Sequence, residues 1–379
     1  MAQTSIWHGD GTTNTWSVGG PANFQRLSGS TFSAVSFAQG DSVLFDDSGS
    51  NTPAVNISGN LTPGTVTVNA NQAYTLGGTG TLSGAMTLTK SGSGTLTLSG
   101  VNTYTGATQV NGGALILTGT LSNTGGTITV GNGAILNISG ATITTTTLHI
   151  LSGGTLSGTG AITGTVSVDT GGVVTTGSAL HSTFTGAGLV TINTGGNTFT
   201  TGNANSFNGF AGTLNLNSTG VGKLALNTAG QNFGAGATVN INSGSTLYMV
   251  SGTTISGTTF NLTGNGNTEN LGALRLEGNT IGATSTINLL SNCTIGGNNT
   301  YSAIIGTIAG NGFGFTKVAN NTFVLSGANT FTGTTSVSAG LLNLSNALAL
   351  QNSTLAANSA FTNSGIIFSS TVSGNAFTL

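Results

Sequence analysis

The chain is 379 residues long, and only 3% of them are Lys, Arg, Asp or Glu, compared with about 25% in an ordinary soluble domain. The formal net charge is −2 and the five basic residues stand singly, so the sequence lacks the basic patch that binds nucleic acid or an anionic membrane surface. Because no apolar run approaches the roughly 18 residues of a membrane-spanning helix, we also expect no membrane insertion.

The glycine content makes disorder the first alternative to a folded domain. Gly accounts for 64 residues, and polar low-complexity stretches are frequent, as they are in disordered chains. Hydrophobic residues nevertheless make up 36% of the chain, mostly as Val, Ile, Leu and Phe in alternating patterns. A chain of this kind can bury apolar surface, so we expect it to fold.

Residues 1–60 are predicted to form an N-terminal cap. The start, Met-Ala-Gln-Thr-Ser, lacks the basic and apolar segments of a signal peptide, and we expect a mature chain from which a signal has been removed. Asp41, Asp46 and Asp47 fit a solvated cap, because a solenoid needs polar residues at its ends. A weak calcium site formed by their carboxylates is the alternative.

Residues 61–379 are predicted to form a solenoid. From residue 110, pairs of apolar residues one position apart alternate with Gly or Asn corners: Leu115 and Leu117, Ile128 and Val130, Leu136 and Ile138, Leu148 and Ile150, Val166 and Val168. Every second pair returns after roughly 20 residues, the length of one coil. The predicted fold is therefore all-β, a single-stranded parallel β-helix (β-solenoid) with roughly 20 residues per coil.

A β-sandwich or barrel is the structural alternative, because these folds also consist of short strands with regular turns. Antiparallel sheets usually protect their edges with Lys and Glu, and this chain has few of either. Parallel coils hide their strand edges against neighbouring coils, which favours the solenoid.

Two segments of the chain repeat each other. Residues 88–117 align without gaps to residues 315–344, and Tyr104 is matched by Phe331. Identical residues occur at five further pairs of positions: Lys90 and Lys317, Leu98 and Leu325, Asn102 and Asn329, Gly106 and Gly333, Gly113 and Gly340. The aromatic residue can fill a coil corner, and the glycines can adopt turn conformations that are closed to other residues.

This unit resembles the autotransporter-associated β-strand repeat, also called the passenger-associated transport repeat, of secreted bacterial surface proteins. The stretch "SIWHGDGTTNTW", which contains Trp7 and Trp16, is similar to the opening of many large proteins of this kind. The resemblance implies an exported, right-handed β-helix that serves as a surface stalk, adhesin or matrix component. We therefore expect an extracellular or cell-surface location.

The sequence offers little material for catalysis, so we expect a non-enzymatic protein without cofactor or metal. His8, His149 and His181 are too far apart for a metal motif, and no glycine-rich stretch ends in the Gly-Lys-Ser/Thr of a phosphate loop. The single cysteine, Cys293, is expected to be a small buried residue. Five scattered basic residues do not supply the Asp, Arg and Lys clusters of polysaccharide-cleaving β-helices.

Three non-enzymatic functions remain. The first is a fibre subunit that polymerises head to tail by strand addition. Its guessed interface consists of the terminal apolar residues Trp7, Trp16, Ile366, Phe368, Phe377 and Leu379. The second is a monomeric adhesin, or a passenger segment of a longer surface protein, with surface glycans as possible partners. The third is ice binding through Thr-x-Thr strands such as 65–67, 95–97 and 127–129.

Overall fold

The computed structural model confirms the predicted fold class: the chain is an all-β parallel β-solenoid with about 21 residues per turn. The structure describes residues 4–28, 30–176, 181–200, 207–227, 230–250, 252–298, 301–356 and 364–369. All regular elements among these residues are strands. The chain divides into two compact units, Met1–Ser178 and Ala179–Leu379, which are described separately here. The predicted boundary at residue 60 and the right-handed coil stay predictions.

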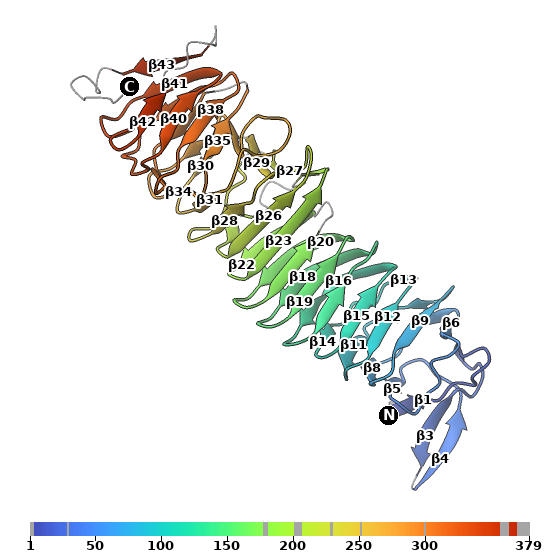
Figure 1. Ribbon diagram of the computed structural model, residues 1–379. Coiled ribbons are helices and arrows are strands. Elements are labelled where there is room, and N and C mark those ends of the chain that lie inside the picture. The colour runs from blue at the N-terminus through green and yellow to red at the C-terminus, as the bar shows by residue number, and fades with distance from the viewer. Residues whose placement is uncertain are drawn as a thin grey trace. The chain divides into compact units, whose positions relative to one another are not determined.

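The first unit is built from two parallel sheets (Figure 1). One sheet contains, in order of pairing, β1 (Thr4–Trp7), β5 (Ser42–Phe45), β8 (Thr65–Asn69), β11 (Thr87–Ser91), β14 (Thr108–Val110), β16 (Thr120–Val130), β18 (Thr142–Ile150) and β20 (Ala161–Val168). The other contains β2 (Thr15–Trp16), β6 (Val55–Ile57), β9 (Tyr74–Gly78), β12 (Thr95–Leu98), β15 (Ala114–Leu117), β17 (Ile135–Asn137), β19 (Thr155–Gly158) and β21 (Val173–Thr176). Three short strands lie between them: β7 (Asn60–Leu61), β10 (Thr81–Leu82) and β13 (Val101–Asn102).

Strand β1 has different neighbours on its two edges. It pairs in parallel with β5 on one side and antiparallel with β3 (Phe24–Ser28) on the other, and β3 in turn pairs with β4 (Thr31–Val35). The hairpin β3–β4 projects from the coils of the first unit in Figure 1. The hairpin therefore occupies the edge of β1 that would otherwise accept another parallel strand.

The second unit has three strand-lined faces. The first face contains β23 (Leu189–Gly195), β26 (Thr213–Ser218), β28 (Thr238–Ile241), β31 (Thr259–Leu262), β34 (Thr286–Leu289) and β37 (Thr307–Ala309). The second contains β24 (Thr198–Thr200), β27 (Lys223–Leu226), β29 (Thr246–Val250), β32 (Leu274–Glu277), β35 (Cys293–Gly296), β38 (Phe315–Val318), β40 (Thr334–Val337) and β42 (Thr354–Ala356). The third contains β30 (Thr254–Ile255), β33 (Thr280–Ile281), β36 (Ser302–Ile304), β39 (Thr322–Leu325), β41 (Gly340–Leu344) and β43 (Ser364–Phe368). A further pair consists of β22 (His181–Gly186) and β25 (Gly209–Phe210).

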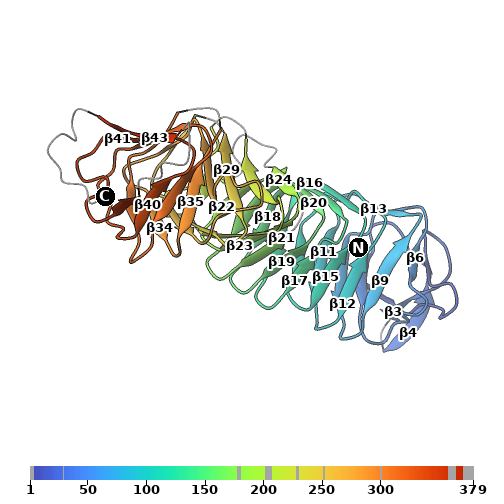
Figure 2. The same ribbon diagram turned by 45° about the horizontal axis from the view of Figure 1, so that its top comes forward.

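Apolar residues from successive coils stack in columns inside each unit. In the first unit one column is in register across the first sheet and contains one buried polar residue, Thr108: Val66, Leu88, Thr108, Ile128, Leu148 and Val166. A second column crosses the other sheet: Leu96, Leu115, Leu136, Leu156 and Val174. The apolar pairs predicted between residues 115 and 168 are all buried. Figure 2 shows how strands of neighbouring coils lie one above another, which lets each main chain bond to the next.

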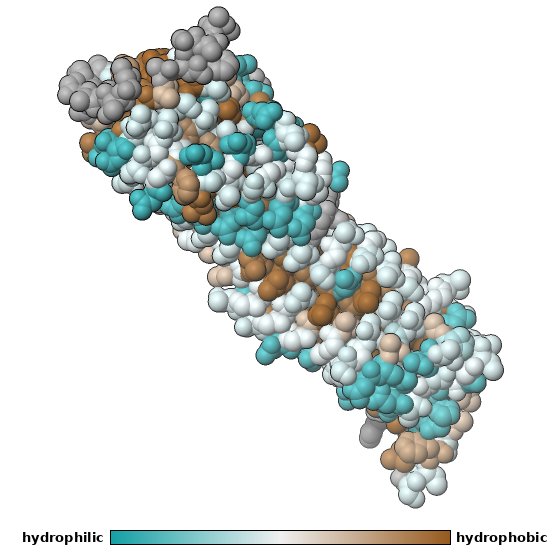
Figure 3. All heavy atoms as spheres, in the orientation of Figure 1, coloured by the Kyte–Doolittle hydropathy of each residue, from teal (hydrophilic) through white to brown (hydrophobic). Residues whose placement is uncertain are grey.

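Uncharged polar residues form ladders of hydrogen bonds on the outer surface. On the first face of the second unit, the side-chain amides of Asn240, Asn261 and Asn288 each donate to the amide oxygen of the Asn one coil earlier, at 2.7 to 2.8 Å, and the series begins at Asn215. Figure 3 shows a hydrophilic patch over β26 and β28. Such a ladder satisfies polar groups along the stack without any charge, as amide ladders do in stacked sheets.

Candidate functional site

The second face of the second unit brings together charged residues that are far apart in the sequence. Lys223 lies at the start of β27, Arg275 and Glu277 lie on β32, and Glu269 lies in the connection that precedes β32. These residues are two of the five basic and two of the seven acidic residues of the chain. Tyr248 on β29 is the direct strand neighbour of Arg275 and completes this group, which we call the ionic cluster.

The side chains of the ionic cluster bind one another. Lys223 Nζ lies 2.5 Å from Glu269 Oε1, and the guanidinium of Arg275 donates from Nε and Nη2 to Glu277 Oε1 at 2.8 and 2.6 Å. The Tyr248 hydroxyl donates to the other Glu277 oxygen at 3.2 Å. The guanidinium also lies 4.0 Å from the centre of the Tyr248 ring, within the range of a cation–π contact. Each charge therefore has an opposite charge beside it.

The electrostatics around Glu269 do not suit it to act as a general acid. Burial raises the pKa of Glu269, but the hydrogen bond and the charge of Lys223 outweigh it, so the pKa of this carboxyl lies below its usual value. A general acid of a glycosidase needs a raised pKa in order to hold its proton at neutral pH. Glu269 is ionised there, and the arrangement is suited to holding the chain together.

The connection before β32 is fixed to a coil two turns earlier. The side-chain amide of Asn267 donates to the carbonyl oxygens of Val221 and Gly222 at 2.9 and 3.2 Å. The amide N–H of Thr268 donates to Gly220 O at 2.9 Å. Together with the contact between Lys223 and Glu269, these bonds clamp the connection across the outer face of the unit.

A buried lysine marks the first of the two repeated segments. Lys90 is on β11 and its side chain is completely buried. Its ammonium donates to three main-chain carbonyl oxygens: Ser91 at 2.7 Å, Gly92 at 3.0 Å and Gly112 at 3.0 Å. Ser91 is the last residue of β11, Gly92 follows it, and Gly112 belongs to the next coil, so the lysine joins two successive coils.

The second repeated segment contains the same arrangement. Lys317 on β38 is completely buried, and its ammonium donates to three carbonyl oxygens: Val318 at 2.8 Å, Ala319 at 2.6 Å and Ala339 at 3.0 Å. Burial lowers the pKa of both lysines, and that of Lys317 falls to about 8. We call each lysine with its three carbonyl groups a lysine staple. The ammonium replaces its lost hydration with carbonyl oxygens, which is how a buried charge is tolerated.

The other matched positions of the two segments also lie inside the coils. Tyr104 and Phe331 are 0% and 1% exposed, so both aromatic rings point inward. Gly113 has a φ of 62°, and Gly340 has a φ of 68°, a left-handed conformation that favours glycine. At Gly106 an added Cβ would lie 2.1 Å from Met86 O of the preceding coil, so only glycine fits. The matched residues thus serve coil-to-coil packing.

The residues guessed to form an assembly interface lie in different surroundings. Trp7 and Trp16 are both 0% exposed and pack with Phe24 in an aromatic cluster at the N-terminal end of the first unit. Their indole rings therefore belong to the core. Ile366 and Phe368 lie on β43, where Phe368 is 50% exposed. Phe377 and Leu379 lie outside the described residues. The assembly role of all six stays a prediction.

The three aspartates of the N-terminal region serve separate local structures. Asp41 pairs with Arg26, Asp46 accepts from Ser48, and Asp47 accepts from residues 71 and 72. In the part of the chain that the structure describes, no three His, Cys, Asp or Glu residues are grouped as metal ligands would be.

Cys293 and His149 lie where their neighbours in the sequence predict. The Cys293 side chain is 2% exposed, and burial raises the pKa of its thiol, which is unsuitable for a reactive thiolate. His149 points outward from β18 and its Nε2 lies 2.8 Å from Asp169 Oδ1.

The outward threonines of the first unit form columns, but these are interrupted. Thr67 on β8 is the neighbour of Thr89 on β11, and the same column continues with Gln109, Thr129 and His149. In this column the hydroxyls therefore extend over two coils before Gln109 intervenes, whereas a neighbouring column carries Thr127, Thr147 and Thr165 over three coils. Ice binding stays a prediction.

The fold and these contacts define a class: a parallel β-solenoid whose charged residues are largely used to join its own coils. Residues 88–116 and 315–344 match the passenger-associated-transport-repeat family model. Two passenger-associated transport repeats on a β-solenoid confirm the resemblance to autotransporter-associated β-helix proteins. No curated protein and no solved structure matches the chain. Among the described residues, no helix is long and apolar enough to cross a membrane.

Proposed function

We propose that this chain is a non-enzymatic structural segment of an exported bacterial surface protein, comparable to the passenger stalk of an autotransporter. The observation that supports this most strongly is the identical lysine staple in both matched repeats. A stalk has to keep its coils joined outside the cell, where no chaperone repairs them. Main-chain bonds and buried staples provide this cohesion and depend little on salt, because exposed ion pairs are few.

Surface display tests the proposal. The full chain is fused between a secretory signal and the translocating domain of an autotransporter, expressed in bacteria, and probed on intact cells with antibody and protease. We expect the chain to reach the surface and to resist proteolysis there, since its main-chain groups are paired between coils. A fused unrelated β-sandwich domain of similar size serves as the control. Retention in the periplasm, or rapid cleavage throughout the displayed chain, would contradict the proposal.

Head-to-tail assembly is a second candidate function. The observation that favours it is β43, in which Ile367 and Phe368 are 41% and 50% exposed and no residue is charged. The hairpin β3–β4 speaks against it, because it covers the edge of β1 to which a further parallel strand would pair. Negative-stain electron microscopy of the concentrated protein tests head-to-tail assembly. Filaments that grow with concentration support assembly, and isolated particles at every concentration contradict it.

A further inference from the structure

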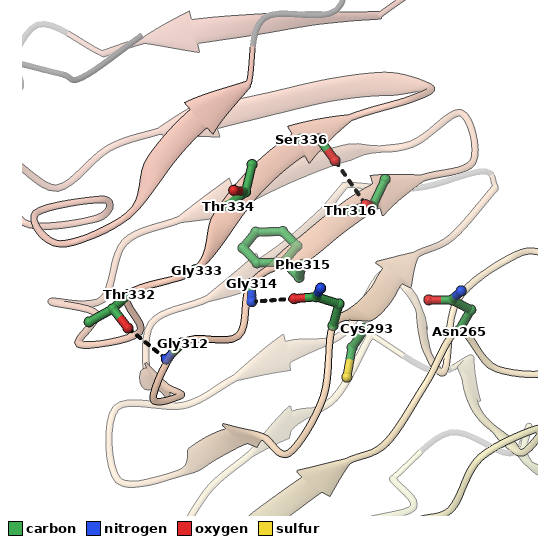
Figure 4. Close-up of a pocket in the computed structure, with 11 residues that line it drawn as sticks. Asn265, Cys293, Gly312, Gly314, Phe315, Thr316, Thr332, Gly333, Thr334 and Ser336 are labelled. Carbon is green, nitrogen blue, oxygen red and sulfur yellow. Dashed lines mark hydrogen bonds between the residues drawn. The ribbon is translucent and has the colours of Figure 1, made fainter.

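A polar groove lies on the second face of the second unit, where β35, β38 and β40 run side by side (Figure 4). Its volume is about 410 Å³, which lies in the range of small-molecule binding sites. Hydroxyl and amide side chains dominate the lining: Asn265, Asn292, Thr316, Thr332, Thr334 and Ser336. The remaining lining residues are glycines, Cys293 and Phe315, and none of the lining residues is charged.

Part of this lining is held in place by hydrogen bonds. The amide N–H of Gly312 donates to Thr332 Oγ1 at 2.7 Å, and that of Gly314 donates to Asn292 Oδ1 at 3.0 Å. The hydroxyls of Thr316 and Ser336 bond to each other at 2.8 Å. Figure 4 shows these three bonds around the hollow. Three neighbouring coils therefore contribute fixed walls, as a preorganised site requires.

Other groups in the groove are available to a ligand. Among the described residues, no hydrogen bond engages the side chains of Asn265 and Thr334, and both residues are exposed. The side-chain Nδ2 of Asn292 is also available, since only its Oδ1 accepts a bond. One hydroxyl and two amide groups thus face the groove with free donors and acceptors.

An apolar surface borders the groove. Phe313 lies between the lining residues Gly312 and Gly314, and is 38% exposed. Phe313 is not among the residues that line the groove itself; it lines a second hollow of about 300 Å³ together with Leu290, which is 55% exposed. When the alignment of the two repeats is extended by two residues toward the N-terminus, Phe313 is matched by Met86, and Met86 is buried. The exposed ring is therefore a feature of the second repeat.

We propose that this groove binds a short stretch of a neutral oligosaccharide. Free amides and hydroxyls recognise sugar hydroxyls, and the exposed Phe313 ring offers the apolar surface on which the C–H face of a sugar ring packs. The groove offers no cation to an acidic glycan, because its lining holds no charged residue and the ammonium of Lys317 on β38 is buried in its staple. A peptide strand has no free edge here, since β38 pairs with β35 on one side and β40 on the other.

The proposal does not depend on export, so its test is separate from the display experiment. Binding of soluble cellohexaose, laminarihexaose and chitohexaose to the purified full chain is measured by saturation-transfer difference NMR, with hexagalacturonate as the acidic comparison. We expect at least one neutral hexasaccharide to bind. We also expect Asn265→Ala, Thr334→Val and Phe313→Ala each to raise its Kd at least fivefold. All three residues are exposed, so the fold should persist, and circular dichroism verifies this.

The matched control is Thr286→Val, which removes the same hydroxyl from an outward position on β34 outside the groove. It should leave the Kd unchanged. The proposal is overturned if none of the three neutral hexasaccharides binds, if hexagalacturonate binds more tightly than they do, or if the groove variants bind as well as the wild-type chain.

Discussion

Replacing Lys317 with Met is expected to lower the local free energy of unfolding around the second repeat by about 3–5 kcal/mol. Met fills a similar volume but donates no hydrogen bond, so the carbonyl oxygens of Val318, Ala319 and Ala339 lose their shared partner inside the coil. A buried carbonyl without a partner costs about 1–3 kcal/mol. Part of this loss is recovered, because the variant no longer has to bury a charged ammonium group. Lys90→Met should have the same effect in the first repeat.

Hydrogen exchange followed by mass spectrometry measures this effect repeat by repeat. Lys317→Met should accelerate exchange in peptides from 315–344, and Lys90→Met in peptides from 88–116, with the other repeat as the internal reference. Thr89→Met is the matched control, because it adds the same side chain at an outward position of β11. If both lysine variants exchange as slowly as the wild-type chain, the lysine staples do not join the coils.

Replacing Arg275 with Met is expected to destabilise the second unit by about 3 kcal/mol. Glu277 is 7% exposed, and the guanidinium of Arg275 is its cationic partner at 2.6 Å. Without it, the buried carboxylate loses its cationic partner, although the Tyr248 hydroxyl and the Asn298 N–H still donate to it. Removing one member of a buried ion pair costs more than removing both, because the remaining charge has lost its hydration without replacement.

A double-mutant cycle tests this explanation. We expect Arg275→Met/Glu277→Leu to recover most of the stability that Arg275→Met loses, as measured by urea unfolding followed by hydrogen exchange in peptides of the second unit that include 274–277. The control is Lys223→Met, whose partner Glu269 is more exposed, so a loss of about 1 kcal/mol is expected. If the double variant is less stable than Arg275→Met alone, the buried charge of Glu277 does not explain the loss, and the side chain of Glu277 stabilises the second unit through its other contacts.

The alternation of inward-facing and outward-facing residues is a local property of the sequence, and it was sufficient to predict the strands. In the segment Thr87–Ser91, Leu88 and Lys90 occupy alternate positions, so the same rule that places Leu88 inside also places Lys90 inside. The buried lysine was thus readable from its spacing, together with the match to Lys317. Describing the five basic residues only as scattered single charges missed this signal.

The ionic cluster offered no comparable signal. Lys223 and Glu269 are 46 residues apart, more than two coils of about 21 residues, and Glu269 lies in a connection instead of a strand. Which residues meet there depends on the length of each turn and on the path of the connection that carries Asn267 and Glu269 over earlier coils. The groove beside β38 likewise combines residues of four coils.

The sequence by itself determined that this chain is a sparsely charged, parallel, coiled β-structure with two related repeats, because alternation and coil length are properties of neighbouring residues. Only the tertiary structure decided which outward side chains of different coils meet, because that register is set by turns of unequal length. For the same reason it decided that charged residues join coils and that polar side chains of neighbouring coils line one groove beside β38.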